Sequence, residues 1–324
     1  MEQREGYVVF IGGPCVDEYY SVGRWPHEGD KFVGRFAGNV PGGMIANAAC
    51  VFAGYGPKTY CFYGMGRGEI TDFLLGDLET HGVDTSRMIL LEGHQDGKCV
   101  IFQSSADRTI LVVEGEERRL RLDEEQRRFL SGAEFVYTTL QCMERFEDAP
   151  GLFCEMKANG AKIVLDNEPS TYVNGWERYM QHTHTAFFNE HSLELFEEGG
   201  SEEALLHRLF DMGVQIVVET LGKEGCAVVT RQERFAVPAY DVPVMDTTGA
   251  GDTFNSSFVF GLSRGWALGE SARFATAAAN MAVMAQGPRS GITSEGKVRA
   301  FMRQNAHLLG GKTSHIDTKE VGSK

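Results

Sequence analysis

The sequence predicts a three-layer α/β/α fold with a mostly parallel central sheet and a small β lid. From residue 123 onward, apolar runs of strand length alternate with helical patterns, which is typical of a parallel sheet covered on both faces. Residues 31–36 and 99–113 also have strand patterns, but they carry too many polar side chains for that buried sheet. We therefore place them in a second, half-exposed sheet that forms the lid.

The individual elements follow from hydrophobic periodicity and from turn residues. Predicted strands cover 7–11, 31–36, 58–63, 135–139, 162–165, 185–188 and 215–219, with hairpins at 99–103/109–113 and 225–230/233–237. Predicted helices cover 44–53, 70–81, 123–130, 152–159, 201–212, 253–262, 270–285 and 294–304. We expect one domain over 1–305, with lid segments near 31–40 and 97–114 inserted in it, and a polar tail over 306–324.

Composition excludes several classes of protein. The 324 residues carry a net charge of −14 without a long basic run, which argues against a nucleic-acid partner. No apolar run approaches the ~20 residues of a membrane span, and no signal peptide is visible, so we expect a cytoplasmic protein. The seven cysteines include no CxxC pair, and Cys50, Cys61 and Cys226 lie in apolar runs that predict buried, reduced thiols.

The most informative segment is 245–255, which has the sequence M-D-T-T-G-A-G-D-T-F-N. Gly249, Ala250 and Gly251 precede a helical pattern, so their main-chain amides lie where unsatisfied N–H groups favour an anion. Asp252 places a carboxylate inside that positive region. Phosphoryl transfer needs both groups, because amides stabilise the developing charge and a base accepts the hydroxyl proton. A first-turn acid at an ordinary strand–turn–helix joint is the structural alternative.

A resemblance decides between these readings. D-T-T-G-A-G-D-T-F resembles the C-terminal signature of the ribokinase-like, or PfkB, family of carbohydrate kinases. Residues 41–49, P-G-G-M-I-A-N-A-A, resemble the family's N-terminal G-G-x-x-x-N pattern, and residues 220–225, T-L-G-K-E-G, resemble its T-L-G-x-x-G turn. The resemblance implies an ATP-dependent kinase that uses Mg²⁺ and phosphorylates a hydroxyl of a small sugar.

The resemblance also implies roles for particular residues. Asp252 would be the general base and the amides of Gly249–Gly251 the anion hole, while the sugar would be bound by Asp17, Gly42, Gly43 and Asn47. ATP would be bound by Asn189, Thr220, Gly222, Gly225 and Asn280. The Asp246 loop and the turn at 287–291 would hold a monovalent cation such as K⁺.

Two positions depart from the family pattern. The family usually has N-x-x-E after the strand at 185–188, where the Glu organises magnesium-bound water, and this chain has Ser192 in place of that Glu. Glu190 is the neighbouring acid that could serve the metal. Ser256 and Ser257 follow the base where Gly or Ala is commoner.

The sequence leaves the substrate and the partners open. Arg108 at the lid turn, with Lys98, could meet an acidic sugar, and Gln141 is another candidate substrate contact. A nucleoside kinase of the same superfamily and a non-catalytic sugar- or nucleotide-sensing protein are the alternatives, and a homodimer could form through the lid. A P-loop kinase and a dinucleotide-dependent oxidoreductase are disfavoured, because neither glycine motif is present.

Overall fold

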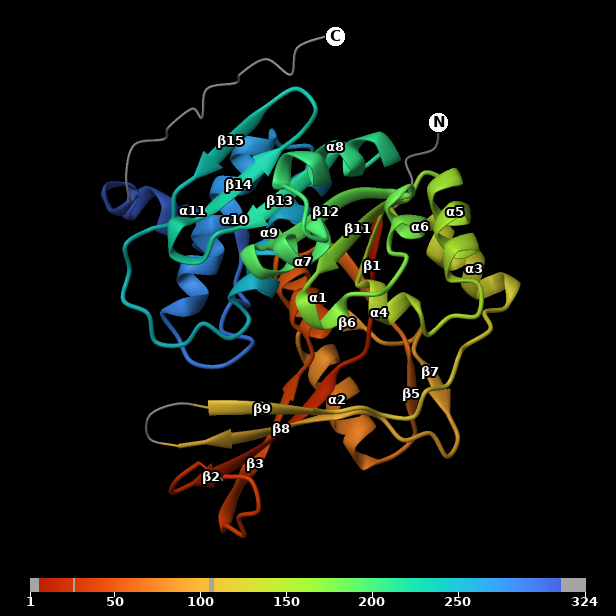
Figure 1. Ribbon diagram of the computed structural model, residues 1–324, viewed down its shortest axis with the longest axis vertical. Helices are drawn as coiled ribbons and strands as arrows, with labels where there is room; N and C mark the ends of the chain where they lie inside the picture. Colours follow the sequence, from red (N-terminus) through yellow and green to blue (C-terminus); the bar gives the residue numbers. More distant parts are fainter. Residues whose placement is uncertain (1–5, 26, 105–107, 310–324) are drawn as a thin grey trace.

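The computed structural model describes residues 6–25, 27–104 and 108–309 (Figure 1). Its strands are β1 Tyr7–Ile11, β2 Cys15–Val22, β3 Gly34–Gly42, β4 Lys58–Phe62, β5 Gly64–Gly66, β6 Val83–Asp84, β7 Ile89–Leu91, β8 Lys98–Gln103, β9 Arg108–Val113, β10 Phe135–Thr138, β11 Lys162–Asn167, β12 Thr183–Asn189, β13 Ile216–Thr220, β14 Cys226–Val229 and β15 Arg234–Val237. Its α-helices are α1 Met44–Gly54, α2 Glu69–Thr80, α3 Glu124–Gly132, α4 Leu140–Met143, α5 Ala149–Ala158, α6 Glu177–Met180, α7 Glu190–Glu197, α8 Glu202–Met212, α9 Ala250–Ser263, α10 Leu268–Val283 and α11 Glu295–Gln304. Short 3₁₀ turns lie at η1 Pro169–Thr171, η2 Gly222–Glu224 and η3 Ala306–Leu308.

A nine-stranded sheet with the order β15-β14-β13-β12-β11-β10-β1-β4-β6 forms the centre of the molecule. Its strands pair in parallel from β6 to β13, and the hairpin β14–β15 adds an antiparallel edge. Because parallel strands share a direction, the loops after β1, β10, β11, β12 and β13 emerge at one edge of the sheet, where ligands bind in such folds.

Two buried clusters cover the two faces of this sheet, as the alternation of β1 shows. Val9 and Ile11 join one cluster, with side chains from α3, α5, α6, α7 and α8. Val8 and Phe10 join the other, with side chains from α1, α2, α9, α10 and α11. Since successive strand residues point to opposite faces, a strand that is apolar throughout requires helices on both sides. The predicted three-layer α/β/α architecture is therefore confirmed.

A second sheet, with the order β3-β2-β8-β9, forms the small lid. Figure 1 shows it projecting away from the central sheet and its helices. The hairpin of 99–103 and 109–113 is confirmed as β8–β9, although residues 105–107 of its turn lie outside the described residues. The strand expected at 31–36 was misplaced, because β3 covers Gly34–Gly42.

The strand β2 was missed, because the segment after β1 was interpreted as a loop. Its sequence C-V-D-E-Y-Y-S-V contains β-branched and aromatic residues, which favour strands, but its two acids hid the pattern. In a sheet with one solvated face those acids are tolerated, and Asp17 therefore lies in a strand.

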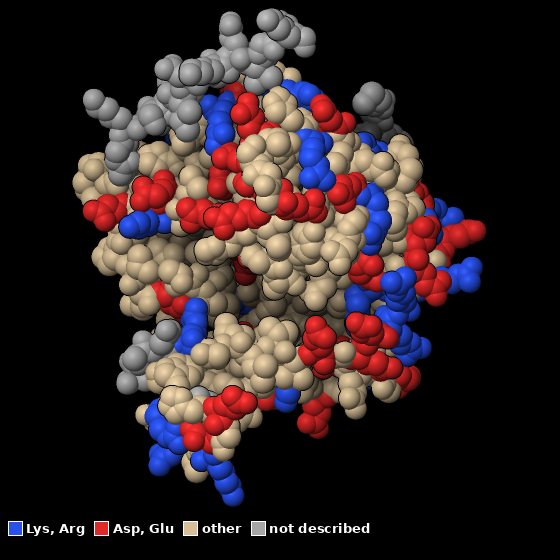
Figure 2. Space-filling model, in the orientation of Figure 1, with Lys and Arg blue, Asp and Glu red and all other residues tan. Residues whose placement is uncertain are grey.

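A hollow separates the lid from the larger body in the space-filling view (Figure 2). Within the described ranges, no helix combines the length and the apolar character that a bilayer span requires. At the carboxyl end of the chain, η3 and Leu309 pack back near Tyr240, and residues 310–324 of the expected polar tail lie outside the described residues.

Candidate active site

Gly249 caps the start of the helix α9, and its backbone has a left-handed conformation with φ of 76°. A Cβ at this position would lie 2.1 Å from the Pro288 carbonyl oxygen, so the turn requires glycine. Among the described residues, the N–H groups of Gly249 and Gly251 have no hydrogen-bond partner, whereas the N–H of Ala250 donates to the Thr247 carbonyl at 3.2 Å. Two of the three amides expected to bind an anion are therefore available to do so.

Asp252, in the first turn of α9, is joined to the N-terminal glycine motif. Asn47 Nδ2 donates a hydrogen bond of 2.8 Å to Asp252 Oδ2, across 205 positions of sequence. No group of the described residues forms a hydrogen bond with the buried Oδ1 atom of Asn47. The two motifs identified separately in the sequence thus form one site, with an acceptor still available to a substrate hydroxyl.

The contact between α1 and α9 includes hydrogen bonds of the two serines that follow in the same helix as Asp252. The Ser256 hydroxyl donates to the Ala48 carbonyl at 2.6 Å, and Ser257 lies 2.7 Å from the Tyr55 hydroxyl. Both serines are fully buried. These departures from the family pattern therefore tie the helix of Asp252 to the helix of Asn47.

Burial raises the pKa of Asp252 to about 7. The hydrogen bond from Asn47 opposes this rise, while the nearby charges of Asp166 and Glu168 add to it. A carboxylate with a pKa near neutrality is a better proton acceptor than an ordinary aspartate. The sequence analysis could not provide this value, because it arises from the surroundings of the side chain.

Asp166 and Glu168 were missed by the sequence analysis. Asp166 lies in the last part of β11 and Glu168 directly follows that strand. The signal was present in the sequence as D-N-E-P at the end of a buried apolar run. The hydroxyl of Tyr137 donates to Asp166 Oδ2 at 2.5 Å, and burial raises the pKa of Asp166 to about 6. Burial also raises the pKa of Glu168. The charge of Glu168 thus acts on both Asp166 and Asp252, near the start of α9.

The nucleotide residues implied by the resemblance lie at the same edge of the sheet. Asn189 and Thr220 are direct partners in the pairing of β12 with β13. Asn189 caps α7, and its Nδ2 donates to Glu168 Oε2 at 2.8 Å. The turn after Thr220 contains Gly222 with φ of 51° and Gly225 with φ of 105°. The structure therefore brings Asn189, Thr220, Gly222 and Gly225 together.

Ser192, which replaces the family's Glu, has a local structural role. It is fully buried, and it exchanges hydrogen bonds of 2.8 Å with Asn189 in a capping box at the start of α7. Glu190 is exposed at the first position of the same helix. The acid whose carboxylate contacts Asn189 is Glu168.

Asn280 on α10 binds a neighbouring loop. Its Oδ1 accepts from the Tyr240 N–H at 3.1 Å, and its Nδ2 donates to the Tyr240 carbonyl at 3.3 Å. These two bonds fix the main chain that leads from β15 toward α9.

At the sugar end implied by the resemblance, the lid meets the body. Gly42 ends β3 opposite Cys15, and a Cβ on it would lie 2.4 Å from Asp17 Oδ2. Gly43, with φ of 97°, begins α1, and its carbonyl accepts from the Asn47 N–H at 2.8 Å. Burial raises the pKa of Asp17. The glycines therefore let Asp17 lie against the backbone close to the helix that carries Asn47.

Asp246 connects the body to the lid. Its Oδ1 accepts from the Thr248 N–H at 2.9 Å and lies 3.3 Å from Arg108 Nη1, while its Oδ2 accepts from the Gly287 N–H at 3.0 Å. These hydrogen bonds and the Arg108 charge outweigh burial and lower the pKa of Asp246 to about 2. Arg108, considered above as a substrate contact, is thus held across the cleft by this carboxylate.

The other two candidate substrate contacts are Gln141 and Lys98. Gln141 is exposed on α4, and Lys98 Nζ lies 2.9 Å from Glu18 Oε1 within the lid.

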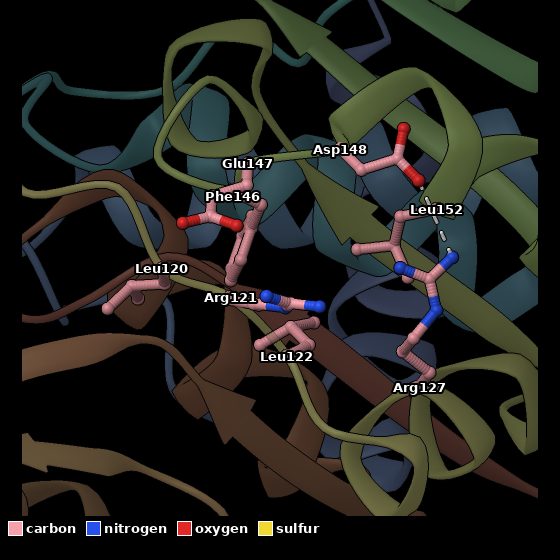
Figure 3. Close-up of a pocket in the computed structure, with 8 residues that line it drawn as sticks. All are labelled: Leu120, Arg121, Leu122, Arg127, Phe146, Glu147, Asp148 and Leu152. Atoms are coloured by element: carbon pink, nitrogen blue, oxygen red, sulfur yellow. Dashed lines mark ion pairs between the residues drawn. The ribbon is translucent and has the colours of Figure 1, made fainter.

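A separate cavity of about 430 Å³, shown in Figure 3, is lined by Leu120, Arg121, Leu122, Arg127, Phe146, Glu147, Asp148 and Leu152. It contains none of the residues proposed for the site. Its Arg127 is engaged by Glu155 at 2.7 Å and by Asp148 at 3.7 Å.

Known proteins share both the sequence pattern and the fold. The pattern of the pfkB family carbohydrate kinases matches residues 18–295. The ribokinase of Bacillus subtilis (strain 168) is 26% identical over 300 residues, covering 91% of this chain and 99% of that protein. The 5-dehydro-2-deoxygluconokinase of Shouchella clausii is 25% identical over 321 residues, covering 94% and 97%.

Solved structures show the same fold. Arabidopsis thaliana ribokinase, complexed with ribose and ATP, has a TM-score of 0.79 at 22% identity and covers 92% of this chain and 98% of its own. An Escherichia coli protein described as a ribokinase II, in complex with ATP and Mg²⁺, has a TM-score of 0.79 at 20% identity, covering 92% and 99%. A Methanocaldococcus jannaschii nucleoside kinase has a TM-score of 0.76 at 18% identity, covering 92% and 98%.

Proposed function

This chain belongs to the pfkB family of carbohydrate kinases, and on that premise we propose that it transfers the γ-phosphoryl group of ATP to a hydroxyl of a small sugar or sugar derivative, with Asp252 as the general base. The enzyme class, a phosphotransferase with an alcohol acceptor, follows from the family. The observation that carries the mechanism is the hydrogen bond between Asn47 and Asp252, because it joins the proposed sugar-binding helix to the proposed base.

The proposed mechanism relies on alignment of the reacting groups. The sugar hydroxyl gives its proton to Asp252 as its oxygen bonds to phosphorus, and the bond from phosphorus to the ADP oxygen breaks. The N–H groups of Gly249 and Gly251 point toward the charge that develops on the phosphoryl oxygens. Asn47 orients the carboxylate and offers its Oδ1 to a second hydroxyl of the sugar. The lid, closing over the cleft, would limit attack by water.

The residues around Asp252 fit a divalent cation. Beyond the effect of burial, the charges of Asp166 and Glu168 raise the pKa of Asp252, and the charge of Glu168 raises the pKa of Asp166. A bound cation would relieve this repulsion. We assign Glu168, oriented by Asn189, to hold Mg²⁺ through its water, with Glu190 as the second candidate. When bound there, Mg²⁺ would offset the negative charge of the ATP phosphates.

Replacing the proposed base tests the mechanism. We expect Asp252→Asn to lower kcat by about 10²–10⁴-fold in a coupled ADP-release assay, with the ATP affinity in calorimetry close to wild type. Asp241→Asn, at an exposed aspartate, is the matched control and should keep its turnover. A turnover of the Asp252 variant within about tenfold of wild type would remove Asp252 from the base role.

The substrate is defined by a panel of sugars, sugar acids and nucleosides with Mg²⁺. The nucleoside alternative is favoured by the fold neighbour named above, and by aromatic side chains on the lid such as Phe36 and Phe102. Turnover of nucleosides alone would replace the sugar-kinase proposal. Nucleotide binding without any turnover would favour a sensing protein.

The panel is run with and without K⁺, because the loop of Asp246 and the turn at Gly287 are the proposed monovalent-cation site. The hydrogen bond between them brings these two segments together. Equal rates with K⁺ and with a bulky organic cation would eliminate that site.

A further inference from the structure

Three potential metal ligands gather on one face of the lid, where β2 and β8 run side by side. Cys15 and Asp17 are two positions apart on β2, so their side chains point to the same face. Cys99 on β8 is the register partner of Asp17, and its side chain therefore joins them. One sulfur or oxygen atom from each residue lies within 4.8 Å of the other two.

The distance between the two sulfurs indicates which ligand fits. Cys15 Sγ and Cys99 Sγ are 3.8 Å apart, and both thiols are free. A disulfide would need about 2.05 Å. A tetrahedral zinc ion, with Zn–S bonds of about 2.3 Å, holds two thiolate sulfurs about 3.8 Å apart. The pair is therefore spaced as two ligands of one metal ion.

The surroundings leave room for an ion to enter. All three side chains are partly exposed. Gly42, which pairs with Cys15 across β2 and β3, contributes no side chain to this face. The other cysteines near the core differ, since Cys50, Cys61 and Cys226 are buried.

We propose that Cys15, Cys99 and Asp17 form a Zn²⁺ site with a fourth position open to water. Zn²⁺ takes sulfur and carboxylate ligands together, with an open position where three protein ligands bind it. On binding, both thiols release their protons to solvent and the sulfurs become thiolate ligands. The ion is distinct from the Mg²⁺ proposed near Asp252, because Mg²⁺ prefers oxygen ligands.

The site would make the enzyme sensitive to zinc, an inference that rests on the proposed function. Asp17 is a proposed contact of the sugar, and a carboxylate bound to Zn²⁺ cannot accept hydrogen bonds from the sugar in the same way. We expect Zn²⁺ to raise the apparent KM for the sugar and to leave the KM for ATP unchanged.

Metal binding is tested separately from activity, on the full chain with a phosphine reductant present. Wild type should bind one equivalent of Zn²⁺ in competition with a chromophoric chelator, and Co²⁺ should give the charge-transfer absorption of thiolate ligands. Cys15→Ser and Cys99→Ser should each weaken Zn²⁺ binding by about tenfold or more and lower the intensity of the Co²⁺ band, and the double variant should abolish that band. Cys154→Ser, at an exposed cysteine, should change neither.

The possible outcomes are distinct. A Co²⁺ spectrum of wild type without the thiolate band, or equal Zn²⁺ binding by wild type and both variants, would overturn the zinc site and leave the kinase proposal intact. Thiolate ligation in a protein that phosphorylates no member of the panel would retain the zinc site and remove the kinase proposal. Thermal melts check whether the two variants fold. If either variant does not fold, the Co²⁺ spectrum of the wild type alone tests the zinc site.

Discussion

At Asp252, one carboxylate is shielded from water, lies near two other acids and accepts a hydrogen bond from Asn47. Each feature changes the free energy of the charged form relative to the protonated form. Together these features favour the protonated form of Asp252 over the charged form more than in an isolated aspartate, and the pKa is therefore raised. The charged form of Asp252, the proposed base, therefore lowers the stability of the folded protein.

The raised pKa predicts a pH dependence of activity. Below a pH of about 7, Asp252 is mostly protonated and cannot accept the proton of the sugar hydroxyl. We expect kcat/KM for the sugar to rise by about tenfold per pH unit on the acid side and to level off above the pKa. Steady-state kinetics on both sides of neutrality, at saturating Mg²⁺, measure this profile. A profile without an inflection near neutrality would contradict the assignment.

The same shift predicts that Asp252→Asn stabilises the protein at alkaline pH. The folded protein holds this proton between the unfolded pKa of 3.8 and the folded pKa of about 7, so stability falls as pH rises through this range and stays low above it. The shift corresponds to at most about 4 kcal/mol. We expect a higher Tm for the variant at pH 8, with the difference vanishing at low pH.

Calorimetry at the two pH values measures this effect, and Asp241→Asn serves as the exposed control. A variant with the Tm of wild type at pH 8 would show that the folded state does not destabilise the charged carboxylate. That result would also weaken the predicted pH profile of activity, because both rest on the same environment.

At the scale of elements, α9 depends on the turn that starts it. Gly249 has a positive φ and lies against Pro288, whereas a Cβ on Gly251 would meet no atom within 4 Å. The two glycines of one motif therefore have different physical roles. Gly249 is needed for the backbone conformation of the turn, whereas Gly251 leaves open space beside its N–H group.

Alanine at each glycine separates these roles. We expect Gly249→Ala to destabilise the protein by at least about 1–3 kcal/mol, through a left-handed conformation and a contact with backbone. Gly251→Ala lies within the helix and should keep or raise the stability, by about 0.5–1 kcal/mol. Urea unfolding measures both. Equal losses in the two variants would contradict the geometry of the turn.

The contact between Glu168, just after β11, and Asn189, at the start of α7, underlies the proposed metal site. Asn189 fixes Glu168, while Glu190 is exposed. We expect Glu168→Gln to raise the Mg²⁺ concentration needed for half-maximal rate and to weaken Mg²⁺-dependent ATP binding in calorimetry. Glu190→Gln is the matched control and should change both much less. A larger effect of Glu190→Gln than of Glu168→Gln would assign the metal role to Glu190.

Several elements were predictable because their periodicity is local. The strands that form β1, β10 and β13, and the helices that form α1, α8 and α9, followed from runs of apolar residues or from helical spacing. The strand β2 did not, because Asp17 and Glu18 interrupt its pattern. The strand β2 is stabilised by pairing with β3 and β8. Because β8 lies far away in the sequence, this pairing leaves no pattern in the residues of β2 themselves.

At the scale of the whole molecule, the lid exposes apolar side chains that the body does not cover. Ile110, Leu111, Val112 and Val113 of β9 are exposed, and Val112 has 64% of its surface accessible. Strand β9 is also the edge of its sheet. An exposed apolar edge strand favours pairing with another chain, so we keep the prediction of a homodimer through the lid.

Light scattering after size exclusion tests the dimer. We expect wild type to elute as a dimer and Val112→Lys to shift to the monomer, because a charge on the edge strand opposes pairing. Leu195→Lys, at an exposed leucine of α7, is the control and should remain dimeric. A monomeric wild type at the concentration of the kinase assay would refute the interface.

The sequence by itself determined the layered α/β architecture and the family, and it singled out Asp252 as the proposed base, because these depend on periodicity and on short contiguous motifs such as the one around Asp252. Only the tertiary structure decided which groups surround those residues. It placed Asn47 on Asp252, gathered Asp166 and Glu168 beside them, and aligned Cys15 with Cys99. Desolvation, charge repulsion and ligand spacing depend on distances between residues far apart in the chain, and such distances exist only once the sheet and its lid have formed.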